Sequence, residues 1–541
     1  GRPLIKKWVI GMSLFCAAMT GPAMAAQEDG ATQAAAQPAA TPQWRPELHY
    51  TPHKYWMNDP NGPVFYNGVY HIFYQYNPMA SEWGNMSWGH ATSTDLLHWQ
   101  EHAVAMPFSH DRDIFSGSVV VDRNNTSGLG TADNPAMVAL YTSVFKEGSS
   151  HSAGIQAQSL AYSLDGGFTW QAYHKDPVLT LSPDSMHFRD PAVTWYEPGH
   201  YWVMTTVVAD APVVKLYRSD NLIDWTFLSD FGPAGFTRPG MLWEMPSLFP
   251  LPLDGDASRQ KWVMMIGVNP WSIAGGSGTT YFVGSFDGRT FHAENLPPDG
   301  SDPAAYDWAD HGADHYAAIL FSGRPAATPL TIGWMNNWDY ANTVPTEPWK
   351  GQMTLPMTLG LKTINNRPRL CFAPDAHYTA LVASRKSYSP GAFQLASGQK
   401  VLPDAARGDV LDIHFEIQGN GARSAGLIVR ASPDDGTGTR IAYDFDRHTL
   451  SVDRSRSGRT DFSPRFSREH IVNMPPARSL SVHVIVDRNS VEVLSLEGSV
   501  VITDLIFPPS GADHVIAFAE GGSATFTHLD VTPLMDHGVR D

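Results

Sequence analysis

A short unit recurs four times between residues 93 and 291, and it constrains the fold more than any other feature of the chain. In each copy a serine and an aspartate give a turn signal that leads, a few residues later, to an aromatic residue. The copies are Ser93-Thr94-Asp95 to Trp99, Ser163-Leu164-Asp165 to Trp170, Ser219-Asp220 to Trp225, and Ser285-Phe286-Asp287 to Phe291. The aspartates lie 70, 55 and 67 residues apart, which is too irregular for a solenoid but suits four-stranded blades with loops of variable length. We therefore predict an all-β fold that begins with a β-propeller of about five blades.

The pattern of apolar and polar residues changes near residue 366, and this change predicts a second domain. From 47 to 365 the segments are short, aromatic and β-branched, with no long helical period, and we assign them to the propeller. A two-sheet sandwich is the structural alternative for this part, although the recurring unit favours the propeller. From 366 to 541 apolar and polar residues alternate as in a β-sandwich. The strands expected there are 410–417, 425–431, 480–486, 490–494 and 523–531.

The first 46 residues are predicted to lie outside both domains. Residues 1–25 have basic residues, an apolar run and small residues ending at Ala25, which together are typical of a cleaved signal peptide. Residues 26–46 are rich in Ala, Gln and Pro and read as a disordered leader. We therefore expect export, with a secreted or periplasmic protein that has no membrane anchor. Loss of Cys16 with the signal would leave Cys371 as the one cysteine, so no internal disulfide is expected.

Charge and composition exclude several classes of partner. The chain has 37 basic and 54 acidic side chains, and a net charge of -17 repels a phosphate backbone, so nucleic acid is not an expected partner. The 22 histidines show no paired ligand spacing, and we predict neither a metal site nor a cofactor. The acidic residues Asp307, Asp310 and Asp314 lack the pattern of a calcium loop, and a supporting role near the site is expected for them. The oligomeric state is left open.

Three acidic residues in the first domain share a motif of acid and proline beside aromatic residues. They are Asp59 in WMNDPNG (56–62), Asp190 in HFRDP (187–191) and Glu244 in LWEMP (242–246). Taken alone, the first motif is also compatible with an ordinary Asx turn. Cleavage of a glycosidic bond needs one carboxylate to attack the sugar and one protonated carboxyl to donate to the leaving oxygen. A propeller brings inner strands together around one axis, so distant acids can meet there.

From residue 47 to 535 these motifs resemble glycoside hydrolase family 32, the β-fructosidases that include levanases, exo-inulinases and invertases. The resemblance also rests on YQYNP (74–78), WGHATSTDLLHW (88–99), FSGS (115–118) and GWMNNWDYA (333–341). It implies that Asp59 is the nucleophile, Glu244 the general acid and base, and Asp190 a stabiliser of the transition state. The substrate-binding positions that it implies are Asn58, Gln75, Trp83, Phe115, Ser116, Arg189 and Trp334.

The function that follows is an exported, exo-acting β-fructosidase. It would hydrolyse terminal non-reducing β-D-fructofuranosyl residues of levan or inulin, and sucrose as well, by a retaining double displacement. A fructosyltransferase that uses the same acids is one alternative, because acceptor choice depends on loops around the site. A fructan-binding protein without catalysis is the other, although a binding module needs neither a nucleophile nor a proton donor.

Local sequence predicts the charge state of the three acids. Arg189 precedes Asp190 and is expected to keep that carboxylate ionised. Glu244 has apolar neighbours, which are expected to raise its pKa and retain its proton. Asp59 is expected to stay charged through hydrogen bonds from its turn. A retaining mechanism predicts that Asp59 and Glu244 lie about 5 to 5.5 Å apart.

The chain departs from the family pattern at three positions. Met245 follows the acid-base glutamate, where the family usually has cysteine. Met357 follows the TLP segment, where an arginine is common, and Lys350 stands where PWRG has its arginine. We expect local changes of packing or charge pairing at these sites.

Overall fold

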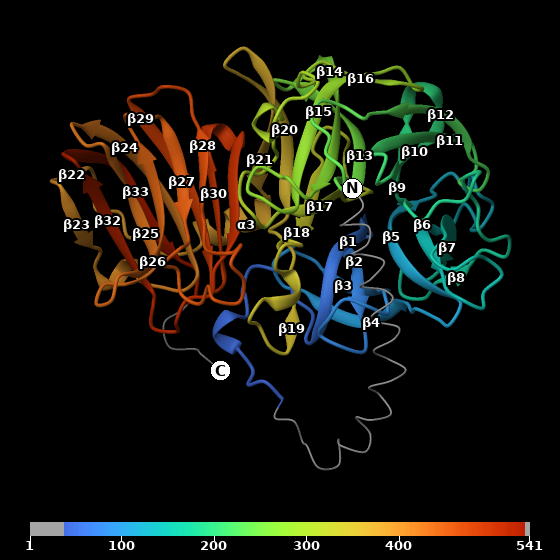
Figure 1. Ribbon diagram of the computed structural model, residues 1–541, viewed down its shortest axis with the longest axis horizontal. Coiled ribbons are helices and arrows are strands. Elements are labelled where there is room, and N and C mark those ends of the chain that lie inside the picture. Colours follow the sequence, from blue (N-terminus) through green and yellow to red (C-terminus); the bar gives the residue numbers. More distant parts are fainter. Residues whose placement is uncertain (1–36, 536–541) are drawn as a thin grey trace.

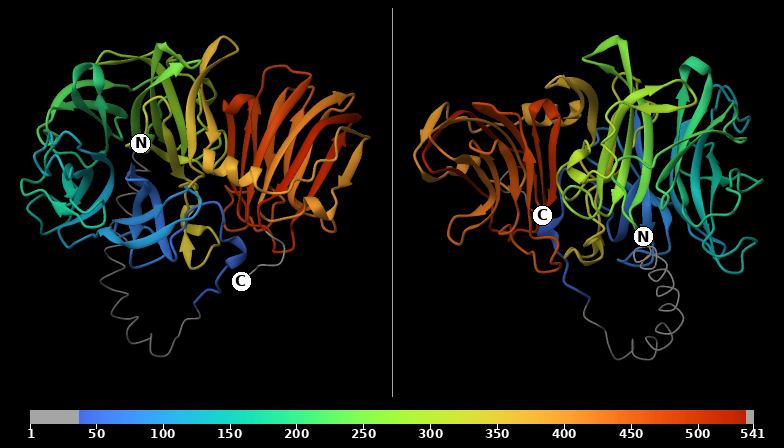
Figure 2. Two further views of the ribbon diagram at one scale, coloured as in Figure 1. Left: turned by 180° about the vertical axis from the view of Figure 1, so that it is seen from behind. Right: turned by 45° about the horizontal axis from the view of Figure 1, so that its top comes forward.

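The computed structural model describes residues 37–535, and the predicted signal peptide lies outside this range. Nearly all regular structure in the described residues is β-strand, and Figure 1 shows two bodies that follow one another along the chain. The first, blue to yellow, has sheets arranged around a common centre, and the second, orange to red, has two facing sheets. The views in Figure 2 show the same side-by-side arrangement. The structure is therefore all-β, with a propeller followed by a sandwich.

The propeller consists of antiparallel sheets in which strands that follow one another in the chain pair with each other. The sheet orders are β19-β1-β2-β3-β4, β5-β6-β7-β8, β12-β11-β10-β9 and β16-β15-β14-β13-β20-β18-β17, with β21 on β20. The strands are β1 (Tyr55–Tyr66), β2 (Val69–Asn77), β3 (Ser87–Ser93), β4 (Gln100–Met106), β5 (Arg112–Val121), β6 (Met137–Phe145), β7 (Gln156–Ser163), β8 (Gln171–Ala172), β9 (Phe188–Tyr196), β10 (Tyr201–Val208), β11 (Val213–Ser219), β12 (Thr226–Phe231), β13 (Leu242–Leu253), β14 (Asp256–Asn269), β15 (Gly278–Phe286), β16 (Phe291–Ala293), β17 (Tyr316–Leu320), β18 (Leu330–Trp334), β19 (Trp349–Lys350), β20 (Met357–Ile364) and β21 (Arg367–Pro374).

The inner strands β1, β5, β9, β13 and β17 form a closed ring. Each contacts the next in this order, and β17 contacts β1. The ring is also tied by β19, a late strand that pairs in parallel with β1 through Tyr55 and Trp349. Residues separated by more than 200 positions therefore meet around one axis, which is the arrangement that a shared site needs.

The recurring serine and aspartate unit forms the turn between the third and fourth strand of a sheet. Ser93 ends β3, and its hydroxyl donates to Asp95, whose Oδ1 accepts the amide N–H of Leu97. In the third copy Asn221 takes this role, accepting from the Ser219 hydroxyl and from backbone amides, so the adjacent Asp220 is not the equivalent residue. The repeat thus marks a local hydrogen-bonded turn, and this is why it recurs without a fixed period.

The second domain is a sandwich of two six-stranded sheets, β22-β33-β24-β29-β30-β31 and β23-β32-β25-β26-β27-β28. Alternate residues such as Ile413 and Val484 enter one core between the sheets, as the alternating pattern predicted. The strands are β22 (Phe393–Leu395), β23 (Gly398–Val401), β24 (Leu411–Asn420), β25 (Ser424–Ser432), β26 (Thr437–Asp444), β27 (Thr449–Asp453), β28 (Glu469–Asn473), β29 (Ser479–Asp487), β30 (Ser490–Ser495), β31 (Val500–Leu505), β32 (His514–Glu520) and β33 (Ser523–Pro533).

Two segments near the domain limits differ from the sequence-based expectation. The hairpin of β20 and β21 crosses the expected boundary at 365 and 366, because residues 367–374 pair with β20. The short helix α3 (Ala376–Ala383) follows and connects the domains. At the other limit, residues 41–46 of the expected leader are folded. Trp44 is buried, and its indole N–H donates to the carbonyl of Pro508. The composition of this segment did not predict that Trp44 would be buried. No helix within residues 37–535 is long and apolar enough to cross a membrane.

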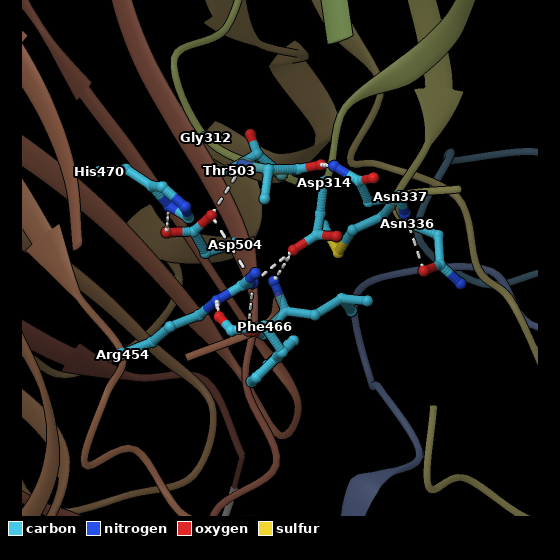
Figure 3. Close-up of polar contacts among 12 residues, drawn as sticks. Gly312, Asp314, Asn336, Asn337, Arg454, Phe466, His470, Thr503 and Asp504 are labelled. Atoms are coloured by element: carbon cyan, nitrogen blue, oxygen red, sulfur yellow. Dashed lines mark hydrogen bonds and ion pairs between the residues drawn. The ribbon is translucent and has the colours of Figure 1, made fainter. Parts of the chain in front are cut away.

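A buried polar network joins the two domains (Figure 3). Arg454 of the sandwich donates to Asp314 Oδ2 of the propeller at 2.6 Å and to the Tyr340 hydroxyl at 2.9 Å. Asp504 accepts the Ala313 amide at 2.9 Å and lies 2.7 Å from His470 Nδ1. The side chains of Arg454, Asp314 and Asp504 are fully buried, so their charges depend on one another.

The network corrects the role expected for the acidic residues near 310. Asp310 accepts the backbone N–H and the hydroxyl of Thr503, and it therefore holds the sandwich against the propeller. Asp307 lies at a different place and pairs with Arg367. None of the three acids lines the cavity described below. Asp310 and Asp314 thus belong to the domain interface, which the sequence could not predict because the contacting strand β31 lies nearly 200 residues later.

His49 makes a second polar contact between the domains. Because this contact involves a titratable group, we expect the free energy of unfolding to depend on pH. Its two ring nitrogens lie 2.7 Å from Asp487 and 2.6 Å from Glu492. Burial lowers the pKa of His49, but the charge of Glu492 and the hydrogen bond to Asp487 outweigh burial and raise this pKa to about 10. A raised pKa means that the stabilisation is complete below the unfolded value of 6.5 and is lost as the pH rises towards 10.

We expect His49→Gln to lower the free energy of unfolding by roughly a few kcal/mol near pH 6, and by less at pH 9 to 10. Thermal melts across this range, with the exposed His53→Gln as the matched control, measure the difference. An effect of His49→Gln that is the same at every pH would contradict a charged imidazole at this position.

Candidate active site

One cavity at the centre of the propeller gathers nearly all the residues that the sequence singled out. The empty space within it, including the open mouth, is about 310 Å³. It is lined by Asn58, Asp59, Gln75, Trp83, Phe115, Ser116, Arg189, Asp190, Glu244 and Trp338. Of the ten predicted site residues, Trp334 alone is missing from this lining, and Trp338 is present without having been predicted.

Bulges in the inner strands direct these side chains into the cavity. The pairing register shifts in β1 between Met57 and Pro60, and in β5 between Ile114 and Gly117. It also shifts in β9 around 190 and 191, and in β13 between Glu244 and Ser247. Bulges of this kind re-aim a side chain without ending the strand. The prolines that follow each acid fit these positions because a bulge leaves a backbone amide unpaired.

Asp59 is held by hydrogen bonds from two neighbours. Ser116 Oγ donates to its Oδ2 at 2.7 Å, and Asn58 Nδ2 donates to its Oδ1 at 3.2 Å. Asn58 is fixed in turn by the indole N–H of Trp56. Burial and the charge of Glu244 raise the pKa of Asp59, while the hydrogen bonds from Ser116 and Asn58 lower it. The carboxylate is therefore rigid, and its protonation depends on the neighbouring acids.

Asp190 and Met245 both have left-handed backbone conformations, with φ values of 67° and 51°. Such values are uncommon outside glycine and concentrate at functional sites. The two residues are linked, because the Met245 amide donates to Asp190 Oδ2 at 2.9 Å. Burial raises the pKa of Asp190, and the charge of Arg189 opposes this shift. Met245 thus contributes its backbone N–H to the site, while its side chain packs in the core.

Arg189 hydrogen-bonds Glu244, and its charge also lowers the pKa of the adjacent Asp190 as the sequence led us to expect, although burial outweighs this effect and raises that pKa. Its Nη2 and Nε atoms donate to Glu244 Oε2 at 2.9 and 3.2 Å. Tyr316 donates its hydroxyl to Glu244 Oε1 at 2.7 Å. The contact between Arg189 and Glu244 was not expected, because these residues lie 55 positions apart in the chain. Tyr316 was missed because no motif marked it.

The charges in the cavity do not balance if all three acids are ionised. Three carboxyl groups face one guanidinium in a buried space. Mutual repulsion among the acids and burial both favour retention of a proton within the group. Burial raises the pKa values of both Asp59 and Asp190, so a proton can be held on one carboxyl of the group while another remains an anion. This is the electrostatic condition for a site that needs both a nucleophile and an acid.

Trp338, and not the predicted Trp334, lines the cavity. Trp334 ends β18 and is fully buried, with its ring centroid 4.8 Å from that of Trp338. Trp338, in the loop that follows, stacks on Trp56 at 5.8 Å and lines the cavity. Both tryptophans belong to the motif GWMNNWDYA, so the motif indicated the right loop. Trp334 is buried because it lies in the strand β18, whereas Trp338 lies in the loop after the strand and reaches the cavity.

We expect Trp338→Ala to raise KM about tenfold with a smaller change in kcat, because the ring forms one wall of the cavity. Trp334→Phe is the matched control. It should lower the melting temperature through lost core packing while KM stays close to the parent value. Steady-state kinetics and thermal melts of both variants test this assignment. A larger KM change in Trp334→Phe than in Trp338→Ala would contradict it.

The other two departures from the family pattern lie away from the cavity. Lys350 Nζ donates to the carbonyls of Val344 and Thr346 and lies 3.2 Å from Glu347 Oε1. Met357 begins β20 and is buried in the cluster that includes the domain interface. Both are accommodated locally, and neither lines the cavity.

Comparison with known proteins gives matches over most of the chain. The model for the glycosyl hydrolases family 32 N-terminal domain matches residues 49–374, and the model for the family 32 C-terminal domain matches residues 380–533. The extracellular exo-inulinase of Aspergillus ficuum is 39% identical over 511 residues, covering 90% of this chain and 94% of the relative. The levanase of Bacillus subtilis strain 168 is also 39% identical, over 91% of this chain and 70% of the relative.

A solved structure with a similar fold is the exo-inulinase from Aspergillus awamori. It superposes with a TM-score of 0.85 and 36% identity, covering 91% of this chain and 98% of the other. A fructofuranosidase from Schwanniomyces occidentalis in complex with fructose superposes with a TM-score of 0.80 and 28% identity over 91% of this chain. The two domains and the order in which they follow each other are thus shared with these proteins.

Proposed function

Because this chain belongs to glycosyl hydrolase family 32, we propose that its central cavity cleaves β-fructosidic bonds with Asp59 as nucleophile and Glu244 as acid and base. The observation that carries the proposal is the convergence of Asp59, Asp190 and Glu244 on one cavity from three different inner strands. Membership of the family makes the chain a glycoside hydrolase. The binding-only alternative is therefore set aside.

The substrate is a fructan, attacked from its non-reducing end. Relatives that cover most of this chain are named exo-inulinases and levanases. The small cavity with largely buried walls supports exo action, since it fits one terminal sugar better than the middle of a polymer. Neutral polysaccharide also suits a chain of net charge -17 that has little to offer an anionic ligand. We infer release of single fructose units from levan or inulin, with sucrose as a smaller substrate.

The reaction proceeds by two displacements at the anomeric carbon. In the first, Asp59 attacks this carbon while Glu244 gives its proton to the leaving oxygen, so a fructosyl ester forms and the glycosidic bond breaks. In the second, Glu244 takes a proton from water, and the resulting hydroxide displaces Asp59 to release fructose with retained configuration. The inferred separation of the two carboxyls is about 5 to 5.5 Å.

The remaining cavity residues hold the sugar and set the charge. Asp190, fixed by the Met245 amide, binds sugar hydroxyls and stabilises the cationic transition state. Arg189 and Tyr316 orient the Glu244 carboxyl through three hydrogen bonds. Asn58, Gln75, Trp83, Phe115, Ser116 and Trp338 complete the walls. Ser116 and Asn58 also keep Asp59 in the orientation needed for attack.

We infer that the propeller has five blades. The closed ring of β1, β5, β9, β13 and β17 supports this count, with β17, β18, β20 and β21 as the last blade joined to its neighbour by one pairing. We place the catalytic domain from residue 47 to 374, extending the expected limit by the strand β21, and the sandwich after it. We also infer export after cleavage near Ala25, in keeping with relatives named as extracellular.

Product analysis with levan, inulin, sucrose and raffinose tests this function. Early release of fructose alone, initially as the β-anomer by NMR, is expected for a retaining exo-hydrolase. A ladder of oligosaccharides would overturn exo action, and an initial α-anomer would overturn the double displacement. Transfer to a sugar hydroxyl remains the second candidate function. Oligofructosides exceeding free fructose at high sucrose concentration would favour it.

A further inference from the structure

Two histidines and an aspartate on the outer face of the sandwich sheet come together beside the domain interface. Asp412 and His414 lie on β24, and His483 lies on the adjacent strand β29. Their strand neighbours Ile413 and Val484 enter the sandwich core, so these three side chains project from the opposite face. They are far from the catalytic acids in sequence and do not line the central cavity.

The pairing register places the two imidazoles side by side. His414 is directly opposite His483 in the antiparallel ladder. Their ring centroids are 3.9 Å apart and the planes differ by 15°. Both Nε2 atoms approach the same carboxylate, since His414 Nε2 lies 3.2 Å from Asp412 Oδ2 and His483 Nε2 contacts Oδ1. The three side chains can each offer a ligand atom, and these atoms all lie within 4.8 Å of one another.

The carboxylate is buried and held in one orientation. The Asp412 side chain is only 1% exposed, and the Tyr378 hydroxyl donates to its Oδ1 at 2.6 Å. Tyr378 belongs to α3, the helix between the domains. A partner that orients a ligating carboxylate in this way is common around metal ions. Among the described residues, Asp412 Oδ2 accepts no well-aligned hydrogen bond, and it lies 3.2 Å from His414 Nε2.

The geometry of the cluster suits a shared ligand. The two imidazoles and the carboxylate present their polar atoms to one another across the β24–β29 ladder, so one divalent cation can contact all three side chains. Asp530, opposite His414 on β33, adds a further negative charge near the cluster.

We propose that Asp412, His414 and His483 form a binding site for a transition-metal cation of the zinc type. Two imidazole nitrogens and one carboxylate oxygen suit zinc and its neighbours, whereas calcium and magnesium prefer oxygen ligands alone. Three protein ligands leave a position for solvent. The His414 side chain is 55% exposed and gives the ion a path to the site. The bound cation ties β24 to β29 and, through Tyr378, to α3, so it stabilises the sandwich beside the interface.

No sequence motif marks this site. Asp412 and His414 supply only two ligands on one strand, and His483 is 69 positions from His414. Strand pairing creates the cluster, and this is why the sequence-based expectation of no metal site needs revision here.

The test uses the full chain without a polyhistidine tag, treated with EDTA and dialysed into metal-free buffer near pH 7.5. Titration calorimetry with zinc chloride is expected to show one ion per chain with a Kd in the micromolar range or tighter. Thermal melts are expected to shift upward with zinc. Cobalt(II) is expected to give visible absorption bands when it binds the nitrogen and oxygen ligands. Absence of zinc binding by the parent protein would overturn the proposal.

Two variants separate this site from other histidines. His414→Gln replaces a half-exposed ligand and should weaken zinc binding at least tenfold and abolish the cobalt bands. His528→Gln is the matched control on the neighbouring strand β33, because His528 is exposed and lies opposite Glu416. It should bind zinc as the parent does. Equal affinity in parent and His414→Gln would overturn the proposal. Fructan hydrolysis is expected to be unchanged in both variants, so this result is independent of the proposed catalytic function.

Discussion

Asp59→Asn is expected to lower kcat on levan and inulin by about 10⁴-fold or more, with little change in the melting temperature. The amide keeps the size of the carboxylate and can still accept the hydrogen bond from Ser116 Oγ, so the cavity keeps its shape. It cannot form the fructosyl ester that the first displacement requires. The large loss in kcat with intact folding is what distinguishes a nucleophile from a residue that only binds sugar.

A second variant makes the assignment of Asp59 more specific. Asp59→Ala leaves space where the carboxylate was, and added azide can then attack the anomeric carbon from the same side. The product expected with an activated fructoside is the α-fructosyl azide, because a single displacement inverts the configuration. Asp184→Asn is a control at an exposed carboxylate and should keep full activity. Retention of more than a tenth of the parent kcat in Asp59→Asn would contradict the assignment.

Arg454→Met is expected to destabilise the protein by about 3 to 5 kcal/mol, the largest effect on stability that we predict for a single residue of the interface. Arg454 donates to Asp314 and to Tyr340, and its side chain is fully buried. Methionine fills much of the volume but leaves the Asp314 carboxylate without its cation. Asp504, 3.8 Å from the guanidinium, loses the same partner. An uncompensated buried charge costs more than the ion pair contributes.

Thermal and denaturant-induced unfolding measure this loss. Arg465→Met is the matched control, since Arg465 also crosses the interface, to Asp339, but is 56% exposed. A surface ion pair of this kind contributes at most about 1 kcal/mol. Because the protein has two domains, two separate transitions in the Arg454→Met variant would indicate that the domains have come apart. Equal effects of the two substitutions would contradict a role for burial in the network.

The three acids of the cavity and the general architecture were predictable from sequence because both depend on local signals. Each acid lies in a short motif with a proline that fits a bulge, and Asp59, Asp190 and Glu244 lie together in the structure as expected. The serine and aspartate turns are closed by hydrogen bonds within a few residues, so they appear directly in the sequence. The strands of the sandwich follow from the alternation of apolar and polar residues.

Contacts between distant segments could not be predicted in this way. Arg189 contacts Glu244, 55 residues away, because the inner strands β9 and β13 lie next to each other. Trp338, and not Trp334, lines the cavity because the end of β18 decides which of the two rings is buried. Tyr316 reaches Glu244 from another inner strand. Each of these depends on how the inner strands are placed around the axis.

The sequence by itself determined which residues we propose to carry the chemistry, since the proposed nucleophile, the proposed acid and their turns lie in contiguous motifs. Tertiary structure alone decided what surrounds them. It paired Arg189 with Glu244 and placed Trp338 in the lining of the cavity. It also buried Arg454 between the domains and brought His414 next to His483. The physical reason is that burial, charge compensation and ligand geometry depend on distances in space, and strand pairing sets these between residues that are far apart in the chain.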